Sequence, residues 1–176
     1  MPMPEPFLVL LDRDGTINID RHYLGDPAGL EFLPGALDGL IALRDAGAVL
    51  AIVTNQSGIG RGMFDREQAD TVNDHLLAML GAHGIAIAHI ALCPHTPDEG
   101  CDCRKPEPGL ALEAAKATGL PLKQAWVIGD KTSDTGLADA VGARGILITA
   151  DRLASPAEHF TARDLVEAAA IILAER

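Results

Sequence analysis

The sequence predicts an α/β fold in which a doubly wound, Rossmann-like parallel sheet lies between layers of helices. Short apolar runs recur along the 176 residues, and segments with helical spacing of apolar residues separate them. Strands that are buried on both faces of a parallel sheet have continuous apolar runs, whereas half-exposed strands alternate. A regular alternation of such strands with helices is typical of doubly wound sheets.

The expected elements follow one another in a simple order. Five strands are predicted: "FLVLL" (7–11), "AVLAIV" (48–53), "IAHIAL" (87–92), "AWVIG" (125–129) and "GILIT" (145–149). The clearest helix begins at Asp65, because "DREQ" matches a capping box closed by Gln68. Its apolar face carries Val72, Leu76, Leu77 and Leu80. Further helices are expected over 36–46, 107–118, 134–142 and 156–174.

Length and composition predict one domain over residues 1–176, with "MPMPEP" (1–6) as a flexible tail. Apolar residues make up 48% of the chain, but no apolar run is long enough to span a membrane, and a signal peptide is not recognisable. We therefore expect a cytoplasmic protein without a membrane partner. The net charge of −11 also disfavours nucleic acid. A monomer is expected.

Two carboxylates follow the first predicted strand in "DRDGTIN". Asp12 and Asp14 are two residues apart, so both can face the same crevice, where a hard cation such as Mg²⁺ would relieve their repulsion. An ordinary Asp-Gly turn with solvated side chains is the alternative. Polar residues after other strands favour the site, because the carboxyl ends of parallel strands meet at one edge. These segments are "TNQSGIGRG" (54–62) and "GDKTSD" (129–134).

This set of motifs resembles the haloacid dehalogenase superfamily of phosphatases, whose four motifs correspond to "DRDGT", Thr54, Lys105 and "GDKTSD". The resemblance implies that Asp12 is a nucleophile that becomes an aspartyl-phosphate and that Asp14 is the general acid and base. It also implies catalytic roles for Thr54 and Lys105. Mg²⁺ would be held by the carboxylates of Asp12 and Asp130 and by the main-chain oxygen of Asp14.

All three cysteines of the chain lie in "CPHTPDEGCDCRKP" (93–106). A disulfide, a reactive cysteine or a buried apolar Cys93 could each account for part of this pattern. However, the cysteine count is odd, a C-x-C disulfide is strained, and a nucleophile is already available in Asp12. Three cysteines and one histidine are a known ligand set for structural zinc. We therefore predict a zinc loop over 93–103, with ligands Cys93, His95, Cys101 and Cys103.

The zinc loop, together with "LDRDGTIN" and "TNQSGIGRG", resembles the D-glycero-D-manno-heptose 1,7-bisphosphate phosphatase family. The resemblance implies a small zinc-bound loop in place of a large cap domain, and removal of the 7-phosphate from that sugar. It implies that Lys131 supports the metal carboxylates. Substrate would be bound by residues of three segments: Asp20, Arg21, His22 and Tyr23; Thr54, Asn55, Gln56 and Ser57; and Arg104 and Lys105.

Other functions and residues stay open at this point. Histidinol-phosphate phosphatases share the four motifs and a similar zinc loop, and a phosphotransferase would use the same nucleophile. A noncatalytic zinc module that binds nucleic acid is the alternative from another class, which the net charge of −11 opposes. Asp134 could serve the site or cap a helix, and Arg61 could approach substrate or face solvent. Trp126 is expected in the core. Four histidines are expected to be structural or solvated: His75, His83, His89 and His159.

Overall fold

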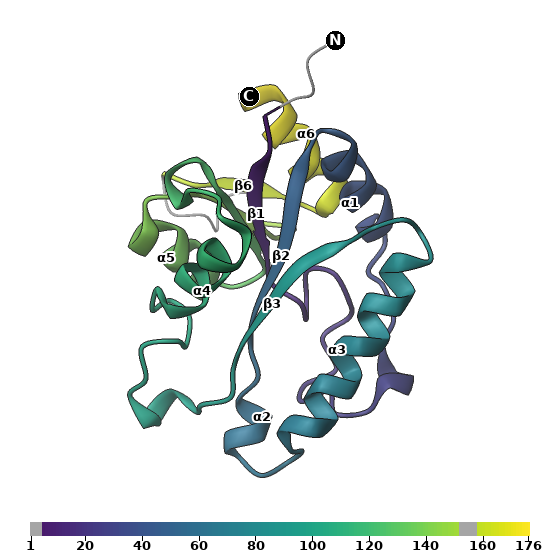
Figure 1. The fold of residues 1–176 in the computed structure, drawn as a ribbon, viewed down its shortest axis with the longest axis vertical. Coiled ribbons are helices and arrows are strands. Elements are labelled where there is room, and N and C mark those ends of the chain that lie inside the picture. The colour runs from purple at the N-terminus through teal and green to yellow at the C-terminus, as the bar shows by residue number, and fades with distance from the viewer. Residues whose placement is uncertain (1–4, 152–157) are drawn as a thin grey trace.

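The computed structural model describes residues 5–151 and 158–176, which form a six-stranded sheet with helices on both faces (Figure 1). All strand pairs are parallel, and the order is β3-β2-β1-β4-β5-β6. The strands are β1 (Phe7–Leu11), β2 (Ala48–Asn55), β3 (Ile87–Cys93), β4 (Trp126–Gly129), β5 (Arg144–Ile148) and β6 (Phe160–Ala162). The predicted doubly wound α/β fold is confirmed.

Helices cover the two faces of the sheet and bury two apolar cores. Alternate residues of β1 face opposite sides: Val9 and Leu11 join one core, and Leu8 and Leu10 join the other. The first core includes residues of α1 (Ala36–Asp45), α3 (Arg66–Gly81) and α6 (Leu165–Glu175), and the second includes residues of α4 (Gly109–Thr118) and α5 (Thr132–Val141). Shorter helical segments are α2 (Ser57–Gly60), η1 (Pro27–Gly29), η2 (Pro97–Glu99) and η3 (Leu122–Gln124).

The strand order places β1 at the point where the chain reverses its direction across the sheet. β1 pairs with β2 on one side and with β4 on the other, and Leu11 is in register with both Ile52 and Ile128. The segments that follow β1, β2 and β4 therefore leave the sheet at the same edge. In open α/β sheets the ligand crevice forms at such a reversal.

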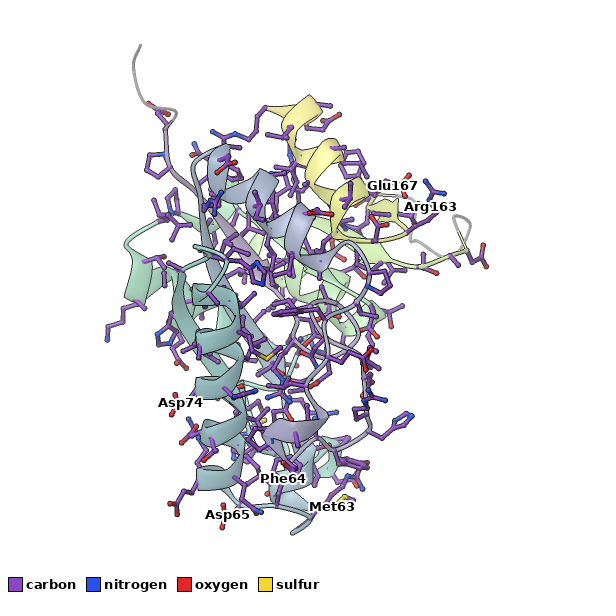
Figure 2. All side chains as sticks on the ribbon, turned by 90° about the vertical axis from the view of Figure 1, so that its right-hand side faces the viewer. Met63, Phe64, Asp65, Asp74, Arg163 and Glu167 are labelled. Atoms are coloured by element: carbon purple, nitrogen blue, oxygen red, sulfur yellow. The ribbon has the colours of Figure 1, made fainter. Side chains whose placement is uncertain are left out.

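Helix α3 begins where the sequence predicts it. The Asp65 carboxylate accepts a 2.8 Å hydrogen bond from the Gln68 backbone N–H, and the Gln68 side-chain oxygen accepts one of 2.9 Å from the Asp65 N–H. This capping box satisfies two amides that would otherwise have no partner in the first turn. Figure 2 shows Asp65 at this end of α3, with Met63 and Phe64 close by.

The helix predicted over 156–174 is wrong in its first part. Phe160–Ala162 forms strand β6, which pairs with Ile146–Ile148 of β5, and α6 begins only after Asp164. Phe and Thr favour strands, and the pairing gives the β5 backbone groups partners that a helix could not supply. The Asp164 carboxylate accepts a 2.9 Å hydrogen bond from the Glu167 N–H, which fixes the new start. Residues 156 and 157 lie outside the described residues.

Smaller differences concern helix starts and the chain ends. The helix predicted from 107 begins at Gly109, and the one predicted from 134 begins at Thr132, which places Asp134 inside its first turn. Glu5 and Pro6 of the predicted tail are exposed, and residues 1–4 of it lie outside the described residues. Within 5–151 and 158–176, none of the helices is long and apolar enough to cross a membrane.

Candidate active site

Motif one lies directly beyond the end of β1. The Asp12 backbone N–H donates to the Ile128 carbonyl oxygen at 2.9 Å, which places Asp12 at the edge of the sheet. The residue is only 6% exposed. Gly15 has a φ of 83°, and a Cβ atom there would lie 2.2 Å from a carboxylate oxygen of Asp130. Only glycine allows this left-handed turn and this close approach of Asp130 to motif one.

Lys105 lies between two carboxylates in the interior. Its Nζ is 2.9 Å from Asp12 Oδ1 and 2.7 Å from Asp134 Oδ1, and it donates to the Val53 carbonyl at 2.8 Å. Burial alone would lower the pKa of Lys105, but the negative charges of Asp12 and Asp134 outweigh it and raise that pKa. Lys105 is therefore a fixed positive charge beside Asp12.

Asp130 completes a group of three carboxylates with Asp12 and Asp134, whose oxygens lie within 4.8 Å of one another. Burial and the charge of Asp12 raise the pKa of Asp130 to about 6, although Lys131, 3.3 Å away, opposes this shift. A divalent cation would relieve the repulsion, and carboxylate oxygens are the ligands that Mg²⁺ prefers. The donors beside Asp12 therefore fit Mg²⁺.

Asp14 is held apart from this group by side-chain donors. Its Oδ2 accepts hydrogen bonds from Arg13 Nη2 at 2.9 Å and from Gln56 Nε2 at 2.7 Å, and its Oδ1 accepts one from Asn18 Nδ2 at 2.9 Å. Gln56 also donates to the Thr54 hydroxyl at 2.8 Å. These contacts connect motif one to motif two and fix the direction of the Asp14 carboxylate.

A cavity of about 220 Å³ opens above Asp12 and contains most of the predicted site residues. Its lining consists of Asp12, Asp14, Asp20, His22, Tyr23, Asn55, Gln56, Ser57, Arg104, Lys105, Lys131 and Ser133. The predicted magnesium ligand Asp130 does not line it, and neither do two of the predicted catalytic and substrate-binding residues. Arg21 points to Glu31, with Nη2 2.6 Å from Oε2, and Thr54 is fully buried behind Gln56.

The cysteine and histidine side chains of the predicted zinc loop converge. Sulfur–sulfur distances among Cys93, Cys101 and Cys103 are 3.0 to 3.7 Å, and His95 Nδ1 lies 3.5 Å from Cys93 Sγ and 3.3 Å from Cys103 Sγ. Zinc bonds of about 2.3 Å to sulfur give tetrahedral edges of about 3.8 Å. The cluster therefore fits one tetrahedral zinc ion. No disulfide joins Cys93, Cys101 and Cys103 in the structure.

The cluster is joined to the cavity by the residues that follow it. The Arg104 backbone N–H donates to Cys101 Sγ at 3.3 Å, and Arg104 Nη1 donates to the His95 carbonyl at 3.1 Å. The Lys105 N–H donates to Asn55 Oδ1 at 3.0 Å. The loop thus fixes both the backbone and the guanidinium of Arg104 beside the cavity.

Comparison with known proteins agrees with this site. The family described as HAD-hydrolase-like matches residues 102–168. A D-glycero-beta-D-manno-heptose-1,7-bisphosphate 7-phosphatase of Pseudomonas putida is 40% identical over 142 residues, which cover 80% of this chain and 81% of that protein. A protein of the same name from Photorhabdus laumondii is 41% identical and covers 72% and 71%.

The chain belongs to the D-glycero-beta-D-manno-heptose-1,7-bisphosphate 7-phosphatase family. The crystal structure of a D,D-heptose 1,7-bisphosphate phosphatase from B. bronchiseptica, in complex with magnesium and phosphate, superposes with a TM-score of 0.87. It is 31% identical, and the match covers 97% of this chain and 99% of that one. The predicted family and its haloacid dehalogenase-like fold are therefore confirmed, and the chain is a phosphatase of the haloacid dehalogenase type.

In this heptose bisphosphatase family member one cavity residue was not predicted from the sequence, and two residues whose roles were left open can now be placed. Ser133 lines the cavity, and only its place in "GDKTSD" could have indicated it. Asp134 serves both of its expected alternatives, because it pairs with Lys105 and accepts the Lys131 N–H at 3.0 Å. Arg61 does not line the cavity, and its guanidinium lies 5.8 Å from the Tyr23 ring centre.

Proposed function

We propose that this chain removes the 7-phosphate from D-glycero-β-D-manno-heptose 1,7-bisphosphate, with Asp12 as the nucleophile. The contact that carries the proposal is the 2.9 Å pair between Lys105 Nζ and Asp12 Oδ1, at the base of a polar cavity. Oδ1 also accepts the Arg13 N–H at 2.8 Å, whereas Oδ2 accepts no hydrogen bond from the described residues. One carboxylate oxygen is thus held, and the other is available for attack.

In the first step, an Asp12 oxygen attacks phosphorus while the bond from phosphorus to the sugar oxygen breaks. Asp14 gives its proton to that departing oxygen, which leaves an alcohol and an aspartyl-phosphate. In the second step, Asp14 takes a proton from water, whose oxygen attacks the same phosphorus and releases phosphate and Asp12. Lys105 stabilises the negative charge that spreads over the phosphoryl oxygens in both steps.

We assign Mg²⁺ to the carboxylates of Asp12 and Asp130 and the main-chain oxygen of Asp14. When bound, it supplies positive charge at the phosphoryl oxygens and lowers the repulsion between them and Asp12. Lys131 contributes from the other side, because its Nζ lies 3.3 Å from Asp130 and 3.6 Å from Asp20. Magnesium in the B. bronchiseptica structure supports this assignment.

We assign zinc to Cys93, His95, Cys101 and Cys103 as a structural ion. Four protein ligands close the tetrahedron and leave no position for a reacting water. The cysteines therefore do no chemistry, and their role is to hold Arg104 at the cavity. The guanidinium can bind the sugar hydroxyls or the second phosphate through two parallel hydrogen bonds.

The proposed substrate is a small phosphorylated sugar. A cavity of about 220 Å³ has room for a sugar phosphate, and the net charge of −11 disfavours polyanions such as nucleic acid. His22, Tyr23 and Ser57 line its mouth and are proposed to contact the sugar, together with Asn55. We still expect this protein to be a monomer and to be cytoplasmic.

Steady-state rates on three substrates test the substrate assignment. We expect kcat/KM to be highest for the β anomer of heptose 1,7-bisphosphate and lower for its α anomer. For histidinol phosphate it should be at least about tenfold lower, because that substrate has no second phosphate for the cationic side chains of Arg104 and Lys131 to bind. The wild-type protein with Mg²⁺ is assayed by phosphate release. A higher kcat/KM for histidinol phosphate would contradict the substrate while leaving the mechanism intact.

A further inference from the structure

Arg13, between the two catalytic aspartates, is a fully buried cation. Its side chain is 0% exposed, although its neighbours Asp12 and Asp14 both line the cavity. A guanidinium stays charged at any physiological pH, so burying it is costly unless an anion and hydrogen-bond acceptors surround it. Asp14 is the acidic residue that pairs with Arg13 in the described part of the chain, with 2.9 Å between Nη2 and Oδ2.

Asn73 holds the other arm of this guanidinium. It lies on the buried face of α3 among Ala69, Val72 and Leu76, and is 6% exposed. Its Oδ1 accepts a 2.8 Å hydrogen bond from Arg13 Nη1. A buried polar side chain lowers the stability of the fold unless it has a hydrogen-bond partner, and Arg13 is the partner of Asn73.

The two arms connect α3 to Asp14 through one rigid group. Nη1 is held by Asn73, while Nη2 donates to both Asp14 oxygens, at 2.9 and 3.2 Å. Because a guanidinium is planar, fixing one arm also fixes the plane and position of the other. The neutral amide of Asn73 does this without a second negative charge, so Arg13 keeps its ion pair with Asp14.

We propose that Asn73 and Arg13 are positioning residues for proton transfer by Asp14. The inference rests on the proposed function, in which Asp14 gives a proton to the sugar oxygen as the bond from phosphorus breaks. Neither residue touches the cavity, so each acts through Asp14. Loss of the Asn73 contact lets the guanidinium turn and moves the Asp14 carboxylate from the line of proton transfer.

The test compares two truncations on one helix. Asn73→Ala removes one hydrogen bond and leaves the buried charge pair in place, so the protein stays folded. Asp74→Ala is the matched control, since Asp74 is exposed and Figure 2 shows it on the outer side of α3. Each full-length variant is assayed with Mg²⁺ on heptose 1,7-bisphosphate and on p-nitrophenyl phosphate.

The two substrates differ in their need for the proton. A sugar alkoxide is a poor leaving group and needs protonation, whereas p-nitrophenolate leaves as a stable anion. We expect Asn73→Ala to lower kcat/KM for the sugar by about tenfold, part of the roughly 10²–10⁴-fold that general acids contribute, and to change kcat/KM for the aryl phosphate less than about twofold. Asp74→Ala should match the wild type on both substrates.

An equal loss on both substrates, or no loss on either, would overturn the inference. If the wild type failed to hydrolyse the sugar phosphate, the proposed function would fall instead. The inference would then be decided by crystal structures of the wild type and Asn73→Ala. A displaced Asp14 carboxylate in the variant would support it, and an unmoved carboxylate would overturn it.

Discussion

At the scale of single residues, the proposed chemistry depends on the carboxylate of Asp12. Lys105 and the Arg13 N–H hold its Oδ1, and the sheet edge fixes its backbone through the Ile128 carbonyl. An asparagine at this position keeps an oxygen for Lys105 but is a far weaker nucleophile. A substitution of Asp12 by asparagine can therefore test the chemistry in a protein that keeps its fold.

Asp12→Asn should lower kcat by at least about 10³-fold, because the aspartyl-phosphate no longer forms. The far-UV circular dichroism spectrum should stay close to that of the wild type, since the Lys105 contact persists. Phosphate release under excess Mg²⁺ measures the loss. Undiminished turnover in the folded variant would contradict the assignment of Asp12.

Asp134 is a second residue whose charge matters, here for stability. It is fully buried, with Oδ1 2.7 Å from Lys105 Nζ. Asp134→Asn keeps an oxygen for the Lys131 N–H but removes one of the two counter-charges of Lys105. We expect the free energy of unfolding to fall by about 3 kcal/mol, as when one partner of a buried pair is lost.

Urea unfolding measures this change, with Asp74→Asn as the control because Asp74 is an exposed acid within a helix. The double variant Lys105→Met/Asp134→Leu removes both charges and should be more stable than Asp134→Asn, though inactive. A loss below about 0.5 kcal/mol in Asp134→Asn would mean that Asp12 alone compensates the charge of Lys105.

The sequence predicted the residues of the site better than their directions. Asp12 and Asp14 were predicted from their places after a strand, and Lys105 was predicted from the resemblance to the superfamily. Arg21 lies in a predicted binding segment but pairs with Glu31, ten residues away, and nothing in "DRHY" indicates this turn. The burial of Arg13 was equally hidden, because its partner Asn73 comes from a distant helix.

At the scale of elements, the loop over 93–105 has little regular secondary structure after Cys93, the last residue of β3. Its helical content in the described structure is the short η2, and Arg104 is held through Cys101 and His95. Lys105 has further anchors in Asn55 and Val53. Zinc removal should thus affect Arg104 more than Lys105.

Metal analysis should find about one tightly held zinc per chain, and its removal by a chelator should increase amide hydrogen exchange over 93–105. With Mg²⁺ restored, KM should rise by about tenfold or more through loss of the Arg104 contact, a charged hydrogen bond of roughly 1.5–3 kcal/mol, while kcat changes less. Equal exchange and equal KM in zinc-free protein would show that the loop needs no ion.

The elements also show where sequence periodicity is insufficient. Continuous apolar runs such as "FLVLL" predicted their strands, and the capping box at Asp65 predicted the start of α3. "FTA" of β6 is only three residues long and is half-buried, so its pattern cannot be separated from that of the following helix. Its pairing with β5 makes it a strand, and this partner is known only from the fold.

At the scale of the whole molecule, the site is formed by the reversal of strand order at β1. The segments after β1, β2 and β4 supply the proposed nucleophile, a polar wall and the proposed metal carboxylate, while the segment after β3 supplies Arg104 and Lys105. No large cap domain covers the cavity within the described residues, so short loops select the substrate. The net charge of −11 repels large anions, so we expect small anionic ligands that the local positive charges of Arg104, Lys105 and Lys131 attract.

The central claim is that this cavity removes one particular phosphate. Phosphorus NMR of heptose 1,7-bisphosphate during turnover tests it most directly, because the 7-phosphate and the anomeric 1-phosphate give separate signals. We predict that the 7-phosphate signal is replaced by the signal of inorganic phosphate while the 1-phosphate signal persists. With Asp12→Asn, both sugar phosphate signals should persist. Loss of the 1-phosphate signal, or no release of phosphate by the wild type, would contradict the account.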